Sequence, residues 1–319
     1  SEELGFPFRR TGSLVLAFSP EEEHALEGLR ENGEKNGVEG LEIIDRKRLE
    51  ELEPEVGPDA VSALRCTETG IASPYEYCIA LAENAVRNGV TLRLGAEVQS
   101  VEKTAPGGGR SGFRVGIGGR SAGAGGAPDG RSTDPARDDS RDDGSTVECD
   151  FVVNAAGVHA DRVAALAGDP SIAIRPRQGQ YLVFQRGTGK LARHVIFQAP
   201  TERGKGVLVT STTWGNLIVG PNAQEIPERE DTSTNEEILR YIVSTARKSI
   251  PGFDLAKVIR SFSGIRATEK GKDFVVRPSE SVTGLVHAAG IDSPGLTASP
   301  LIAERVVDHL RELGLEAEE

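Results

Sequence analysis

Apolar residues follow two different spacings along this chain. Short apolar runs bounded by turn residues predict strands at residues 11–18 and 285–289. A helical spacing predicts a helix at the C-terminal end, carried by Leu301, Ile302, Val306, Val307, Leu310 and Leu313. The chain therefore contains both strands and helices, and residues 287–300 form a junction between a strand and a helix.

The first hundred residues alternate between the two spacings. A charged helix is expected at residues 20–36, and a short strand and helix follow before Pro54. Ser73 caps a further helix with Pro74 at its first position, and its apolar face is expected to comprise Ile79, Leu81, Ala82 and Val86. A strand over residues 90–94 should follow. This alternation is typical of α/β proteins.

The middle of the chain has a different pattern. The stretches "RPRQGQYLVFQR", "HVIFQAP" and "GVLVTSTTWGNLIVGPN" alternate like strands of an antiparallel sheet, with turn residues between them. A helix that ends near Pro251 follows, and two more strands are expected within residues 258–279.

Residues 118–145 contain no Leu, Ile, Val, Phe, Tyr or Trp. Such a segment cannot bury enough surface to offset the entropy of ordering it. We expect a disordered loop at the tip of a hairpin whose arms are residues 112–117 and 145–153; an interaction tail is the alternative.

Composition restricts the partners. A net charge of −12 argues against nucleic acid, which is bound through clustered Lys and Arg, but it allows an anionic substrate in a local basic pocket. Cys66, Cys78 and Cys149 form no CxxC pair, so we expect no metal site and a cytoplasmic protein with reduced thiols. The first ten residues lack the apolar region of a signal peptide.

Two predicted strands, "DFVVNAAG" and "GLVHAAG", end in the same Ala-Ala-Gly before a helix. The second continues as "IDSPGLTASP", where glycines allow close approach to a ligand and the helix start favours an electron-rich group. An ordinary strand-to-helix turn explains either motif alone. The pair indicates a nucleotide-type cofactor over the carboxyl ends of a sheet.

With these motifs, and with "RRTGSLVLAF", "RPRQGQYLVF" and "FSGIRA", the chain resembles FAD-dependent oxidoreductases of the D-amino-acid-oxidase-like fold. The branch is that of glycerol-3-phosphate dehydrogenases and L-2-hydroxyglutarate-oxidising relatives. The resemblance implies FAD as cofactor. It places Val98 at the adenine, the turn of Ala155, Ala156 and Gly157 at the dinucleotide, and six residues by the flavin and pyrophosphate: Gly290, Ile291, Asp292, Gly295, Leu296 and Thr297.

The resemblance also implies that Arg266, in a Gly-x-Arg position, binds the carboxylate or phosphate of a small anionic substrate. A lone arginine on a strand is otherwise a surface residue. A base would assist hydride transfer, and we considered three histidines for that role. Structural roles are favoured for His159 and His287, which leaves His194 as the candidate base.

One family feature is missing from the sequence. The strand–GxGxxG–helix unit that binds the pyrophosphate is absent, so we expect an FAD-binding Rossmann-like domain that is incomplete at its N-terminal side. The expected domains are an antiparallel-sheet substrate domain (residues 1–72 and 171–262) and the FAD domain (residues 73–170 and 263–319). A partner chain could supply the missing unit, and a peripheral membrane component or a redox partner could accept the electrons.

The predicted activity is oxidation of a small anionic alcohol by hydride transfer to FAD. Glycerol 3-phosphate is the first expected substrate and a 2-hydroxy acid the second. Two alternatives stay open: an amino-acid oxidase, and a non-catalytic fragment or subunit that needs a partner.

Overall fold

The computed structural model describes residues 1–104, 112–119, 144–200, 206–271 and 273–316. Contacts within the chain divide it into two compact units. The first unit comprises residues 1–90 and 177–265, and the second comprises residues 91–176 and 266–319. Each unit is therefore assembled from two separate stretches of sequence, and the strands β10 and β15 continue from one unit into the other.

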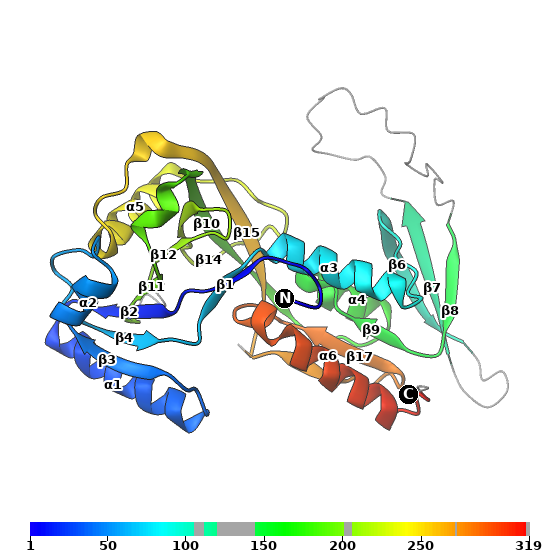
Figure 1. Ribbon diagram of the computed structural model, residues 1–319. Helices are drawn as coiled ribbons and strands as arrows, with labels where there is room; N and C mark the ends of the chain where they lie inside the picture. Colours follow the sequence, from blue (N-terminus) through cyan, green and yellow to red (C-terminus); the bar gives the residue numbers. More distant parts are fainter. Residues whose placement is uncertain (105–111, 120–143, 201–205, 272, 317–319) are drawn as a thin grey trace. The chain divides into compact units, whose positions relative to one another are not determined.

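A nine-stranded sheet organises the first unit (Figure 1). Its order is β14-β10-β13-β12-β11-β2-β4-β3, with β15 pairing with β10. β2 and β11 pair in parallel, and the neighbouring pairs β2–β4, β11–β12 and β12–β13 are antiparallel. The strands are β2 (Ser13–Ala17), β3 (Leu41–Asp45), β4 (Ser62–Cys66), β10 (Ile174–Arg186), β11 (Val195–Gln198), β12 (Leu208–Ser211), β13 (Asn216–Gly220), β14 (Gln224–Glu225) and β15 (Val258–Glu269).

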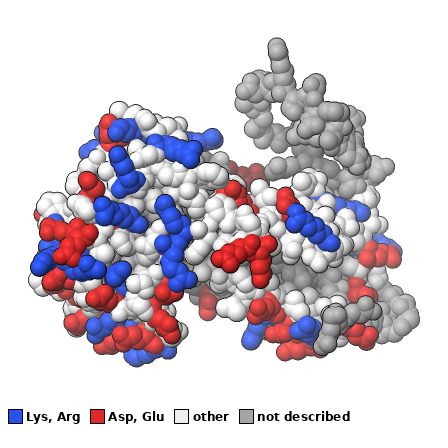
Figure 2. Space-filling view, in the orientation of Figure 1, with Lys and Arg blue, Asp and Glu red and all other residues white. Residues whose placement is uncertain are grey.

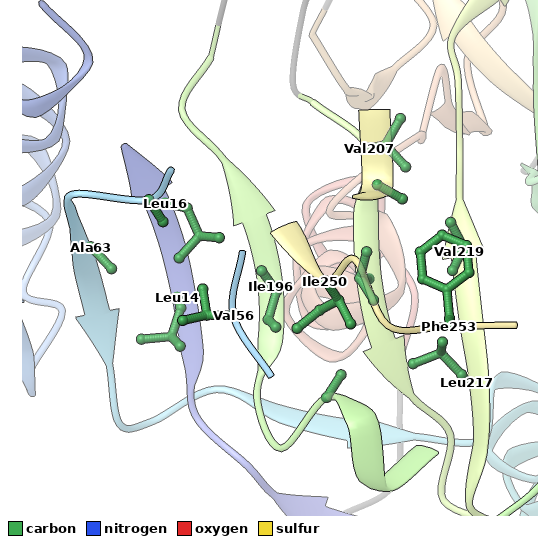
Figure 3. Packing of buried hydrophobic residues seen from close by; sticks show 14 of the residues in the cluster. Leu14, Leu16, Val56, Ala63, Ile196, Val207, Leu217, Val219, Ile250 and Phe253 are labelled. Atoms are coloured by element: carbon green, nitrogen blue, oxygen red, sulfur yellow. The ribbon is translucent and has the colours of Figure 1, made fainter. Parts of the chain in front are cut away.

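Helices pack on this sheet where apolar positions recur. α1 (Pro20–Lys35) packs against β2, β3 and β4, and α5 (Glu236–Ser249) packs against β11, β12 and β13. The larger apolar cluster of this unit, to which α5 contributes, is drawn in Figure 3, and Leu14, Ile196 and Leu217 are fully buried in it. α1 buries Leu26 in a separate, smaller cluster. The remaining elements of this unit are α2 (Arg46–Leu52), α3 (Pro74–Arg87), η2 (Thr188–Leu191), η3 (Leu255–Lys257) and the small pair β1 (Phe8–Arg10) and β5 (Gly70–Ala72).

The second unit contains two three-stranded sheets. One has the order β6-β7-β8, with β6 (Ala96–Lys103), β7 (Phe113–Gly119) and β8 (Thr146–Cys149). The other has the order β16-β17-β9, with β16 (Val275–Pro278), β17 (Leu285–Ala289) and β9 (Val152–Asn154). α4 (Ala160–Leu166), which follows η1 (Gly157–His159), packs against β6 and β9, while α6 (Gly295–Glu312) packs against β16 and β17.

Helix α3 forms as predicted, but its apolar face is not buried. The Ser73 hydroxyl accepts from the Glu76 N–H, as expected of an N-cap. Ile79, Leu81 and Val86 are all exposed, however, and no residue of the helix is buried. α3 is grouped with the first unit, where the Tyr77 ring packs on Phe6 with centroids 4.9 Å apart, although we had expected it in the FAD domain.

The predicted strand at residues 90–94 is wrong. These residues are irregular, and the strand begins only at Ala96. Val90, Leu92 and Leu94 are exposed, with Leu94 at 85%. The alternating sequence is compatible with a strand, but no neighbouring strand among the described residues supplies the hydrogen bonds that a sheet requires.

The hairpin around the polar segment is confirmed, because β7 pairs with β8 in antiparallel register. Its second arm is shorter than the predicted residues 145–153, since β8 ends at Cys149 and β9 pairs with β17 in another sheet. Its first arm is longer than expected, since Gly118 and Gly119 pair with Glu97 and Ala96. The predicted boundary of the disordered segment at residue 118 is therefore wrong, because Gly118 and Gly119 belong to β7. Most of that segment, residues 120–143, lies outside the described residues.

Two further features are the distribution of charge on the surface and the apolar character of the helices. On the face drawn in Figure 2, basic side chains are intermixed with acidic ones. Within the described part of the chain, no helix combines the length and the apolar character needed to cross a bilayer.

Candidate cofactor and substrate site

The two Ala-Ala-Gly motifs of the second unit lie at one edge of its parallel strand pair. β9 and β17 run in parallel with Asn154 opposite His287. The first motif follows β9 directly, whereas the second begins with the last two residues of β17 and ends at Gly290. Because the carboxyl ends of parallel strands meet at the same edge of a sheet, the turns at Ala155–Gly157 and Gly290–Asp292 are neighbours there.

Gly290 is required by the backbone and by its surroundings. Its φ of +64° lies in the left-handed region that favours glycine. A Cβ at this position would stand 2.5 Å from the Glu269 Cβ, so β15 approaches the turn closely. Gly157 also has a positive φ of +56°, but no atom lies within 4 Å of the position of its missing Cβ, so space is open beside that turn.

The start of α6 exposes backbone donors. No side chain caps the helix at Pro294, and Leu296 and Thr297 in its first turn are exposed. N–H groups in a first helical turn have no partner within the helix and attract electron-rich groups. Gly295 is buried, and a Cβ there would stand 2.3 Å from the Ile291 Cγ2, so the turn before the helix packs tightly.

β15 brings Arg266 to the same region. The Thr268 hydroxyl donates to the Asp292 carboxylate over 2.9 Å, which ties the end of β15 to the turn before α6. Residues two apart in a strand share a face, so half-buried Arg266 projects on the face of β15 that carries this bond. Arg266 therefore lies on the same face of β15 as Thr268, the residue that bonds to the turn before α6.

A family model matches most of the chain. The model of the DAO family, described as FAD dependent oxidoreductase, matches residues 1–309. The chain belongs to this family.

Relatives agree with this assignment. The chain is 36% identical over 316 residues to a glycerol 3-phosphate dehydrogenase of Caloramator mitchellensis, which covers 99% of this chain and 60% of the relative. It is 30% identical to a glycerol 3-phosphate oxidase of Mycoplasma genitalium, with 97% and 75% covered. The chain therefore spans about three fifths of the first relative and three quarters of the second.

A solved structure supports the fold. The dithionite-reduced L-alpha-glycerophosphate oxidase from Mycoplasma pneumoniae with FAD bound superposes with a TM-score of 0.80 at 28% identity. The match covers 96% of this chain and 74% of that structure. The fold class predicted for the chain, mixed α/β of the FAD-binding oxidase type, is confirmed.

The turns of this family member fit FAD, the family's cofactor. A dinucleotide needs backbone approach and donors for its phosphates. Gly290 and Gly157 provide turns without side chains, and the first turn of α6 provides exposed N–H groups. The cofactor contacts of Ala155, Ala156, Ile291, Asp292, Leu296 and Thr297 remain predictions about residues that the structure gathers at the site.

Val98 lies apart from these turns in β6, opposite Ile117. Its half-buried side chain packs on the cluster that contains Leu285 and Val152, the first residues of β17 and β9. The predicted adenine contact through the Val98 backbone stays a prediction.

His194 belongs to the first unit, where it forms a buried pair. Its Nδ1 lies 3.0 Å from the Glu53 Oε2, and its backbone N–H donates to the same oxygen over 3.0 Å. Arg193 donates its backbone N–H to both Glu53 oxygens. These bonds give the imidazole a structural role at the start of β11, and the predicted role as a base stays a prediction without further support.

Sequence reasoning missed three polar residues of the second unit: Asn154, Asp169 and Thr268. Asn154 is 1% exposed, Asp169 is 1% exposed and Thr268 is 8% exposed. One signal was present in the sequence, because a polar residue precedes Ala-Ala-Gly in both apolar strands, as Asn154 and His287.

Proposed function

We propose that this chain forms the substrate-binding part and much of the flavin-binding part of an enzyme that oxidises glycerol 3-phosphate with FAD. The observation that carries the proposal is the match over 99% of the chain to a glycerol 3-phosphate dehydrogenase at 36% identity. Arg266, on the strand that bonds to the turn before α6, supports it, because this substrate has a phosphate that an arginine can bind as well as an alcohol to oxidise.

The flavin-binding residues act mainly through the backbone. Leu296 and Thr297 at the start of α6 would donate N–H groups to the electron-rich side of the ring or to the pyrophosphate. The Ala155–Gly157 turn would lie against the dinucleotide. FAD, when bound, supplies the acceptor for the hydride that leaves the substrate carbon.

Arg266 would bind the phosphate of the substrate. A guanidinium donates two parallel hydrogen bonds to a phosphate and holds it in one orientation, which a point charge does not. The bond between Thr268 and Asp292 holds this part of β15 against the turn before α6, so the arginine and the cofactor turn keep one geometry.

Bleaching of the flavin tests the substrate. The FAD-loaded protein is mixed without oxygen with glycerol 3-phosphate, L-2-hydroxyglutarate or an amino acid, and the visible flavin band is followed. Fast bleaching by glycerol 3-phosphate alone is expected. Bleaching by L-2-hydroxyglutarate alone would contradict glycerol 3-phosphate as the substrate and favour the 2-hydroxy acid. A mouse protein that is 26% identical to this chain is named L-2-hydroxyglutarate dehydrogenase.

Replacing the arginine tests its role. Arg266→Ala should raise the KM for glycerol 3-phosphate about 100-fold, because a charge-assisted bidentate contact is lost, and Arg266→Lys should recover only part of the loss. Arg260→Ala, which removes an exposed arginine of the same strand, is the matched control and should leave KM unchanged. An equal KM in Arg266→Ala and the control would remove Arg266 from the site.

We also propose that a further strand completes the parallel sheet at β9. Among the described residues, β9 ends the order β16-β17-β9, and Val153 is 42% exposed. An unpaired sheet edge presents free backbone groups and tends to recruit another strand. A GxGxxG segment, on this protein or on a partner chain, would pair here and contribute its phosphate-binding turn.

Flavin retention tests this completion. The purified chain is incubated with FAD and desalted, alone and after co-expression with a GxGxxG-bearing strand–helix segment. Retention only with the added segment supports the proposal, and equal retention without it contradicts the need for a further strand. We also propose a cytoplasmic location, and a redox partner or a peripheral membrane component as the electron acceptor.

A further inference from the structure

Beneath the Ala155–Gly157 turn lies a buried polar network that the proposed chemistry does not use. Asn154 and Asp169 are each 1% exposed and His287 is fully buried. The parallel register of β9 and β17 places Asn154 beside His287. Polar side chains are costly to bury unless their hydrogen bonds are made, so the bonds in this network determine what it does.

Asp169 is the charged end of the network. Its Oδ2 lies 3.0 Å from the His287 Nε2 and also accepts from the Ser279 hydroxyl, while its Oδ1 accepts from the Ser171 N–H over 2.9 Å. Burial disfavours the anion, but the hydrogen bonds from Ser279, Ser171 and His287 outweigh that effect and lower the pKa of Asp169 below its usual range. The carboxylate is therefore ionised at neutral pH.

Asn154 is the other end, and the backbone sets its orientation. Its Nδ2 lies 2.7 Å from the Ala160 carbonyl oxygen, and its Oδ1 accepts from the Ala156 N–H over 3.3 Å. A carbonyl requires a donor and an N–H requires an acceptor, so the two ends of the amide cannot be exchanged without losing both bonds.

This orientation determines the histidine tautomer. The Asn154 Nδ2 also faces the His287 Nδ1 at 3.3 Å, so this amide group donates and the Nδ1 accepts. The imidazole then carries its proton on Nε2, directed at Asp169. One continuous chain of hydrogen bonds therefore runs from the Asp169 carboxylate through His287 and Asn154 to the backbone N–H of Ala156.

We propose that Asp169, His287 and Asn154 are positioning residues that hold the Ala155–Gly157 turn in the conformation that receives the FAD dinucleotide. This inference rests on the proposed contact between that turn and FAD. The three side chains act through the backbone of the turn, with Asp169 as the fixed anchor and Ala156 as the group that is held. A network whose members serve stability alone would not transmit a change at Asp169 to the cofactor.

The chain offers a matched control. Glu53 and His194 form a second buried carboxylate–imidazole pair, with the same 3.0 Å separation, in the first unit. Asp169→Asn and Glu53→Gln make the same carboxylate-to-amide exchange in the two pairs. Both variants are expected to lower the thermal unfolding temperature, so a general loss of stability affects them alike.

FAD affinity and backbone exchange distinguish the two variants. In the FAD-binding protein, Asp169→Asn should raise the dissociation constant for FAD about tenfold and change the visible circular dichroism of bound flavin, whereas Glu53→Gln should change the constant less than twofold. Amide hydrogen exchange at Ala156 should accelerate at least tenfold in Asp169→Asn alone. Equal FAD dissociation constants and equal exchange in the two variants would overturn the proposal.

A milder variant keeps the proposal testable if Asp169→Asn does not fold. Ser279→Ala removes one bond to Asp169 and should weaken FAD binding in the same direction but by less, about threefold. An unchanged FAD dissociation constant with a lower unfolding temperature would show a stability role alone and overturn the inference. These readouts are independent of substrate, so failure of glycerol 3-phosphate to bleach the flavin would contradict the proposed function and leave this test intact.

Discussion

The two units of the chain are stabilised in different ways. The first has a large cluster of nineteen buried apolar residues, built mainly on the nine-stranded sheet and α5, and a second cluster of four beside α1. In the described part of the second, the buried apolar residues form clusters of six and four, and a buried polar network joins Asn154 of β9, His287 of β17 and Asp169. Large apolar cores hold a scaffold, whereas small clusters with directional bonds hold particular backbone turns in place.

The two buried carboxylate–imidazole pairs show the same difference. Glu53 accepts from the backbone of Arg193 and His194 and from the imidazole, and its bonds end within the first unit at the start of β11. Asp169 begins a chain of bonds that ends at Ala156, in the turn that we propose to contact the cofactor. Similar pairs therefore end at a strand start in one unit and at a glycine-containing turn in the other.

The largest expected effect is in the apolar core. Phe184 is fully buried, and its ring meets Phe253 edge-on with centroids 5.4 Å apart. Phe184→Ala should lower the free energy of unfolding by about 4 kcal/mol, because the lost burial is joined by the cost of the cavity. Urea denaturation measures this change, with exposed Leu255→Ala as the control. A loss below about 1 kcal/mol would contradict the view that this cluster dominates the first unit.

A smaller effect, with a pH dependence, is expected in the polar network. Asp169→Asn should cost about 2 kcal/mol near pH 7, because hydrogen bonds to an ionised acceptor become bonds to a neutral one. The folded pKa of Asp169 lies below its unfolded value, so this stabilisation is present above an unfolded pKa of about 3.9 and is lost as the pH falls through the folded pKa. Urea denaturation between about pH 7 and pH 2 should show the two proteins converging. A difference that stays constant with pH would mean that the charge of Asp169 does not contribute.

The smallest effect is expected where an apolar residue has no core to join. Leu94 is 85% exposed, so Leu94→Ser should change the free energy of unfolding of the chain by less than about 0.5 kcal/mol. The same denaturation experiment checks it, and buried Leu285→Ser provides the contrast. A loss of more than 1 kcal/mol would show that the Leu94 side chain is buried by a contact in solution. It would then no longer serve as the exposed counterpart of buried Leu285.

Local structure was largely predictable from the sequence. Ser73 and Pro74 predicted where α3 begins, the apolar run at residues 285–289 predicted β17, and the repeated Ala-Ala-Gly predicted two parallel strands. Capping, φ preference and periodicity act within a few residues, so they can be recognised from the order of the amino acids alone.

Burial was less predictable, as α3 and α5 demonstrate. Both were predicted as helices and both form, yet α5 buries Ile242 and Ala246 against its sheet while no residue of α3 is buried. The spacing of apolar residues specifies which face of a helix is able to pack. Whether that face is covered depends on which other segment reaches it, and that information is not local.

The amino-acid sequence by itself determined the strand and helix types, the glycine turns and the family motifs, because each depends on residues close together in the chain. The tertiary structure alone decided that Thr268 of β15 bonds to Asp292 before α6, that His194 pairs with Glu53, and that Asp169 reaches Ala156 through His287 and Asn154. Asp169 and His287 are 118 positions apart. A hydrogen bond across that separation forms only when the loop after α4 is folded against β17, so only the folded chain shows which polar residues act together.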